Sequence, residues 1–162
     1  MIINFIQNLP PQLATFFLAM LPFTELRASI PIALEIFNLS IWEAFFYSVL
    51  GDIIPAILII FFIGPFSEKF SKKYKIARKF FKWLFKRTRK RFNDSYVTWG
   101  KVALIFFVAI PLPVTGAWTG AIAAWLFNID KKEAISYITL GVIFAGVLVT
   151  LLSLGFLNIF NV

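Results

Sequence analysis

Four long apolar stretches dominate the sequence, at residues 12–37, 41–66, 102–129 and 134–160. As a helix, each is long enough to cross a hydrocarbon core of about 30 Å. Of the 162 residues, 60% are hydrophobic, and the mean hydropathy is +0.84. A water-soluble protein of this size has too little interior to bury so many apolar side chains. The sequence therefore predicts an all-α integral membrane protein, with residues 1–162 forming a single membrane domain.

Prolines interrupt two of these stretches. Pro22 and Pro31 flank a charged segment in PFTELRASIP, and Pro111 and Pro113 lie in IPLPVTGAWTGA, at 110–121. Proline lacks a backbone N–H, and it disfavours helical geometry in the residue before it. We expect all four prolines to break helices.

A shift of 90 residues aligns the two interrupted stretches and the segments that follow them. It places FFLA on FFVA, and it matches Glu43-Ala44 with Glu133-Ala134 and Leu50-Gly51 with Leu140-Gly141. The sequence therefore predicts an internal duplication. Repeat 1 covers about 12–66, and repeat 2 covers about 101–160.

The segment between the repeats is strongly basic, and it helps to predict the topology. Residues 66–99 hold 12 of the 16 Lys and Arg residues. The positive-inside rule places 67–99 on the cytoplasmic side of the inner (plasma) membrane. If each interrupted stretch enters and returns as a re-entrant hairpin, each repeat crosses once, and Lys131 and Lys132 are also cytoplasmic. The two repeats are then inverted. If the interrupted stretches cross fully, these lysines lie outside. The charge pattern favours the re-entrant alternative.

The basic segment also has helical amphipathicity. Apolar residues and one threonine recur at helical spacing within 73–92: Ala77, Phe80, Phe81, Leu84, Phe85, Thr88 and Phe92. We expect a helix at the cytoplasmic interface whose Lys and Arg side chains in 69–91 meet anionic lipid headgroups. A topological anchor and a lipid-sensing element are both consistent with this pattern. Because membrane segments flank the basic run, we do not expect a nucleic-acid partner.

Polar residues inside the apolar stretches are the candidate site. Ionisable residues at membrane depth usually face a protein interior or an aqueous cavity, and so does non-helical backbone. We expect the two interrupted segments to meet near the bilayer midplane as a substrate or ion site, rather than to lie as loops among headgroups. The candidate residues are Thr24, Glu25, Arg27, Ser29, Asp52, Thr115, Gly116, Trp118, Thr119 and Gly120.

Several of these residues have two interpretations. Asp52 is a proton carrier or one half of a structural ion pair with Arg27. Gly116 and Gly120 have the G-x-x-x-G spacing that lets helices approach closely, and they equally fit a ligand-binding role. Trp118 lines a pathway or marks the membrane interface.

The chain contains neither cysteine nor histidine, so thiol nucleophiles, Cys/His metal sites and imidazole bases are excluded. None of the common hydrolase or nucleotide-binding motifs occurs. We therefore expect no enzyme, no cofactor and no metal site.

The motifs LPFTELRASIPIAL and FVAIPLPVTGAWTGA resemble those of the small multidrug export protein family, over about residues 12–155. More distantly, the pattern looks like the DedA (SNARE-associated, VTT-domain) superfamily. That likeness implies two inverted re-entrant hairpins, each followed by a transmembrane helix, together with movement of lipids and proton-dependent membrane homeostasis. Glu25 and Gly51-Asp52 match residues of the superfamily. The arginines of its second hairpin have no counterpart in 109–120, so a phosphate-lipid substrate would depend on Arg27.

Together these features predict a prokaryotic transporter that moves a small amphiphile or lipid, with proton coupling through Glu25 and Asp52. The alternative is a membrane-organising or assembly protein whose buried charges are structural. The substrate and a homo-oligomeric state are left open.

Overall fold

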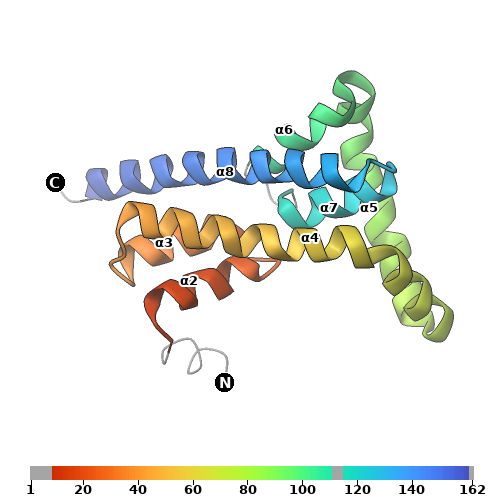
Figure 1. Cartoon of the computed structure of the whole chain (residues 1–162), viewed down its shortest axis with the longest axis horizontal. Coiled ribbons are helices and arrows are strands. Elements are labelled where there is room, and N and C mark those ends of the chain that lie inside the picture. Colours follow the sequence, from red (N-terminus) through yellow and green to blue (C-terminus); the bar gives the residue numbers. More distant parts are fainter. Residues whose placement is uncertain (1–8, 111–114, 161–162) are drawn as a thin grey trace. The chain divides into compact units, whose positions relative to one another are not determined.

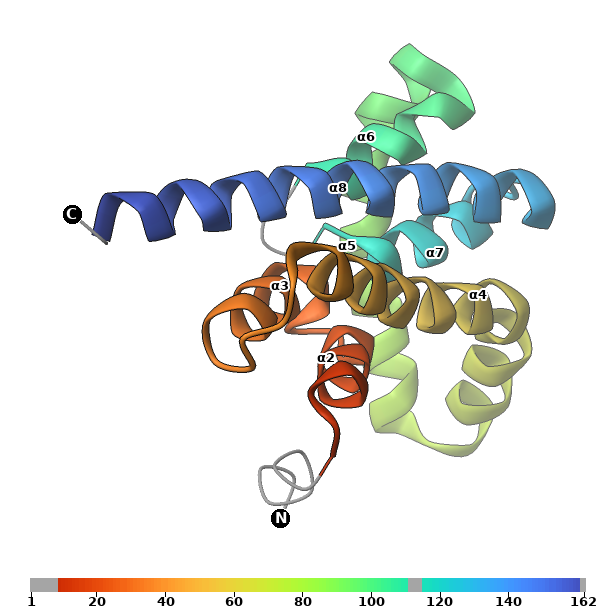
Figure 2. The same cartoon turned by 60° about the vertical axis from the view of Figure 1, so that its left-hand side comes forward.

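The computed structural model describes residues 9–110 and 115–160, excluding the side chains of 94–95 and 156–160 (Figures 1 and 2). Every element in the described part is helical, which confirms the all-α prediction. In chain order the elements are α2 (Pro11–Met20), α3 (Glu25–Glu35), α4 (Ile41–Lys73), α5 (Lys75–Trp99), the 3-10 helix η1 (Gly100–Val102), α6 (Ala103–Ala109), α7 (Ala117–Leu126) and α8 (Lys131–Phe160).

Within the described residues, the two helices α4 and α8 are long and apolar enough to cross a membrane. With 33 and 30 residues, they are about 50 and 45 Å long at 1.5 Å per residue. Both expose large apolar side chains, such as Phe62 at 61% and Phe144 at 59%. Such surfaces fit contact with lipid, and the two long apolar helices are consistent with a membrane protein.

The chain divides into two compact units. Unit 1 comprises Met1–Ile54 and Val142–Val162, and unit 2 comprises Pro55–Gly141. Both boundaries fall inside the long helices, so each unit contains one portion of α4 and one portion of α8.

Unit 1 is built around a helical hairpin. Helices α2 and α3 pack against each other and are joined by a turn at residues 21–24, which includes Pro22 (Figure 1). With 10 and 11 residues, each arm is only about 15 Å long. Neither arm alone reaches across a hydrocarbon core of about 30 Å.

The prediction that Pro31 breaks the helix is wrong, because α3 continues through it to Glu35. Within a helix, proline removes one backbone hydrogen bond, and its ring crowds the carbonyl four residues earlier. The side chains of Leu26, Ile30 and Ala33 on this helix are at most 2% exposed. Their packing holds α3 together on both sides of the proline.

Unit 2 contains the corresponding arms α6 and α7, with α5 packed against both (Figure 2). Pro111 and Pro113 lie outside the described residues. Most of the predicted apolar face of α5 is buried or half-buried, and Phe92 is fully buried. The ring centroid of Phe92 lies 5.2 Å from that of Phe107 and 5.1 Å from that of Phe127. Phe80 is an exception, because it is 53% exposed and lies off this face.

Several structural features recur at the 90-residue interval found in the sequence. The long helices begin at Ile41 and Lys131. Before each one, Asn38 and Asn128 adopt the same left-handed φ of 52°. A Cβ atom on Gly51 would lie 2.3 Å from the carbonyl oxygen of Phe16 in α2, and one on Gly141 would lie 2.7 Å from Val108 Cβ in α6. In each unit, therefore, a glycine of the long helix permits close packing on the first hairpin arm.

Replacing Gly51 by alanine should destabilise the protein, because the new methyl group meets backbone rather than a movable side chain. We expect a loss of about 1–3 kcal/mol in the free energy of unfolding. The measurement is a dodecyl sulfate titration in mixed micelles, followed by circular dichroism. Gly155→Ala is the matched control, since no atom that the structure describes lies within 4 Å of a Cβ atom there. Equal stability of the two variants would contradict the packing assigned to Gly51.

Candidate functional site

The tip of the hairpin in unit 1 has an unusual backbone. Glu25, the first residue of α3, is 6% exposed and has a φ of 45°. Non-glycine residues rarely adopt this left-handed conformation, and those that do so often lie at functional sites. The Thr24 hydroxyl donates a hydrogen bond to the carbonyl of Leu18, and the Glu25 N–H donates to the carbonyl of Leu21 at 3.0 Å. The Leu21 N–H also donates to the carbonyl of Leu18, at 3.3 Å, so both of these carbonyls at the end of α2 have partners.

Three ionisable side chains gather at this tip. Arg27 Nη2 lies 3.6 Å from Glu25 Oε2, and the two side chains are 24% and 8% exposed. Residues two apart on a regular helix do not face each other. The left-handed conformation of Glu25 takes it out of the regular helical path. Asp52 of α4 interacts electrostatically with both side chains and accepts a hydrogen bond from the N–H of Leu26.

Asp52 is the most enclosed member of the cluster. It is 1% exposed, and its Oδ1 has no hydrogen-bond partner among the residues that the structure describes. An ionised carboxylate in such a place is costly unless charges nearby compensate it. The single positive charge of Arg27 faces two carboxyl groups, so at most one of the two is balanced by it.

A neighbouring hydrogen bond ties α3 to α4. Ser29 Oγ donates to Ser48 Oγ at 2.7 Å, and both residues are 0% exposed. Sequence reasoning identified Ser29 but missed Ser48. Ser48 precedes Asp52 by four residues, so the two share a face of α4. That spacing was the signal that could have found it.

The predicted residues of the second segment lie in unit 2. Thr115 Oγ1 donates to the carbonyl of Ile110 at 2.9 Å, as Thr24 does to Leu18 in unit 1, and Thr119 Oγ1 donates to Gly116 at 3.3 Å. Gly116 has a φ of 139°, which glycine tolerates and other residues rarely adopt. A Cβ atom on Gly120 would lie 2.6 Å from Val108 Cγ2, so Gly120 permits close packing of α7 on α6.

Trp118 is the remaining member of this group. Its Nε1 is buried and has no hydrogen-bond partner in the described part of the chain. The structure thus brings Thr24, Glu25, Arg27, Ser29 and Asp52 together within unit 1, and it places the other five residues in unit 2. The meeting of the two groups stays a prediction.

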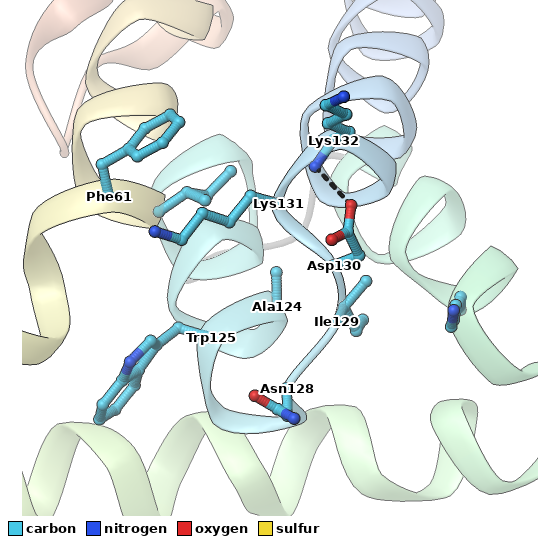
Figure 3. Close-up of a pocket in the computed structure, with 10 residues that line it drawn as sticks. Phe61, Ala124, Trp125, Asn128, Ile129, Asp130, Lys131 and Lys132 are labelled. Atoms are coloured by element: carbon cyan, nitrogen blue, oxygen red, sulfur yellow. Dashed lines mark hydrogen bonds between the residues drawn. The ribbon is translucent and has the colours of Figure 1, made fainter.

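Unit 2 also contains a cavity of about 670 Å³ that sequence reasoning missed (Figure 3). The sequence led us to treat Lys131 and Lys132 only as topology signals. The lining comes from separate parts of the chain: Ile60, Phe61, Lys101, Ala124, Trp125, Asn128, Ile129, Asp130, Lys131 and Lys132.

Comparison with known proteins identifies one family. The family model described as "Putative small multi-drug export protein" matches residues 25–148, which is most of the chain and includes Glu25, Arg27 and Asp52. A search of curated proteins and a search of solved structures each found no match. On the extent of the family match, the chain belongs to the family of putative small multi-drug export proteins.

Proposed function

We propose that this protein is a transporter of a prokaryotic inner membrane and moves a small amphiphile or lipid through a polar site in unit 1. The observation that carries the proposal is the buried cluster of Glu25, Arg27 and Asp52 beside a broken helix. Ionisable side chains within a membrane domain are costly to keep, and they typically mark substrate and proton pathways. The family name supports an export role.

The charges of the cluster suggest how transport is driven. When both carboxyl groups are ionised, Arg27 balances one of them and one negative charge remains. Either a proton or a cationic group of a substrate can neutralise that charge, but the two compete for it. A proton entering from one side then displaces a cationic amphiphile toward the other. Glu25 and Asp52 are the proton carriers in this scheme. For a substrate with an anionic headgroup, protonation of Glu25 instead releases Arg27 to bind the headgroup.

The short helices support re-entrant hairpins, inverted repeats and a DedA-like architecture. Helices α2, α3 and α7 have 10, 11 and 10 residues, so each is only about half as long as a membrane span requires. If each hairpin returns to the side of the membrane from which it enters, only α4 and α8 cross. Residues 67–99 and the start of α8 are then both cytoplasmic, in agreement with their positive charge.

In this topology α5 lies at the cytoplasmic membrane surface. Ile76, Phe80 and Trp83 are 86%, 53% and 53% exposed, and they recur at helical spacing on the outer side of α5. Exposed lysines at 75, 79, 82 and 86 accompany them. Apolar side chains flanked by ammonium groups suit insertion among anionic lipid headgroups.

Removing the carboxylate of Glu25 or of Asp52 should strongly lower the rate of transport. We expect Glu25→Gln and Asp52→Asn to lower the initial rate of ethidium transport at least about tenfold, because the site then lacks the charge for which a proton and a cationic substrate compete. The assay uses proteoliposomes with an imposed pH gradient and two probes, ethidium and a fluorescent phosphatidylglycerol.

Glu35→Gln is the matched control, since Glu35 is an exposed carboxylate on the same helix, α3, and its rate should equal that of the wild type. All variants are first checked for helical content and elution volume. Wild-type rates in both carboxylate variants would eliminate the proposed site. If the wild type moves neither probe, with or without a gradient, the result favours the membrane-organising role.

The re-entrant topology predicts which side of the membrane carries the start of α8. The chain has no native cysteine, so Lys132→Cys and Lys90→Cys each introduce one thiol at an exposed position. An impermeant maleimide should label both variants only after the cytoplasmic side is opened. Labelling of position 132 from outside intact cells, with position 90 protected, would show instead that the interrupted segments cross fully.

A further inference from the structure

The cavity in unit 2 has the dimensions of a ligand site. Its volume of about 670 Å³ is within the usual range of about 300–1,000 Å³ for small-molecule pockets. Residues of α4, η1, α7, the loop before α8 and the first turn of α8 line it. The proposed transport function does not use this cavity.

One wall of the cavity is aromatic and fixed by packing. The ring centroid of Trp125 lies 5.0 Å from that of Phe85 on the basic helix α5. On α4, a Cβ atom at Gly64 would lie 2.9 Å from Trp125 Nε1, so the absence of a side chain there makes room for the indole. Phe61 and Ile60 extend the apolar lining along α4.

The polar part of the lining is mainly cationic, with three lysines and one carboxylate. Asp130 Oδ1 accepts a hydrogen bond from the backbone N–H of Lys132 at 2.9 Å, which caps the start of α8. Lys101 Nζ donates to Glu133 Oε2 at 2.6 Å, and this hydrogen bond raises the pKa of Lys101. Two of the charged groups are therefore already engaged within unit 2.

Lys131 is placed differently. Its side chain extends from the start of α8 toward Phe61 and Trp125 (Figure 3). Its Nζ lies over the Phe61 ring, 4.8 Å from the centroid. In the described part of the chain, Lys131 forms no salt bridge. Lys131 is an exposed residue, and an ammonium group held near an aromatic face can still pair with an anion.

We propose that this cavity binds a phosphate group, with Lys131 as the pairing cation and the Trp125 wall contacting any attached apolar chain. The three lysines repel cations, and the aromatic and aliphatic lining accepts a hydrocarbon or glycerol moiety. The cavity also adjoins α5 through the contact between Phe85 and Trp125. The phosphate belongs either to the headgroup of an anionic lipid or to a free ion.

Native mass spectrometry of the full chain in maltoside micelles tests the proposal by measuring Kd. The probes are dihexanoyl phosphatidylglycerol, dihexanoyl phosphatidylcholine and inorganic phosphate. Lys131→Gln should weaken binding of the preferred phosphate probe about tenfold, because one charge-assisted hydrogen bond is lost. Lys131→Arg, which keeps the positive charge at the same position, should leave Kd within about twofold of the wild-type value.

The probes separate the two sources of phosphate. Tighter binding of phosphatidylglycerol than of phosphate supports a lipid headgroup, and effective competition by inorganic phosphate alone supports a soluble ion. Absence of binding by all three probes would overturn the proposal, as would equal effects of Lys131→Gln and Lys131→Arg on Kd. Loss of transport in Glu25→Gln does not bear on this site.

Discussion

Backbone polar groups in a membrane need partners from the protein, because hydrocarbon offers none. This requirement limits where a helix can be interrupted. At the end of α2 the chain stops its helix after only 10 residues, and the hydroxyl of Thr24 bonds to the carbonyl of Leu18. At the end of α6, the hydroxyl of Thr115 does the same for Ile110. A threonine hydroxyl therefore gives a backbone carbonyl a hydrogen-bond partner at each interruption.

The interruption in unit 1 has a further consequence for charge. Because Glu25 begins α3 in a left-handed conformation, its carboxylate and the guanidinium of Arg27 come within 3.6 Å although they are only two residues apart. Asp52 approaches from α4, held close by the small Gly51 beside α2. The result is an enclosed group of two acids and one base. A purely structural ion pair would need only one of the acids, so the second acid is the feature that a transport role explains.

The helical class and the long spans were predictable, because apolar runs of more than 20 residues have few other folds open to them. The grouping of Glu25, Arg27 and Asp52 was predictable too, because ionisable side chains in apolar surroundings are stabilised by pairing with one another. Pro31 was misjudged because the packing of Leu26 and Ile30 compensates for the hydrogen bond that proline removes. The left-handed conformations of Glu25 and Asn128 are set by the turns around them. The cavity was missed because four helices and a loop contribute its lining, and no local pattern encodes that assembly.

The account depends on water reaching the hairpin tip of unit 1, since neither a proton nor a polar substrate can otherwise arrive at Glu25. The most direct measurement is labelling of Thr24→Cys in membrane vesicles with a polar, impermeant maleimide, compared with Phe144→Cys on the apolar surface of α8. The account predicts labelling at position 24 and protection at position 144, with labelling at 24 slowed by a transported amphiphile. Complete protection of position 24 from both sides of the membrane would contradict it and would leave the buried charges with a structural role.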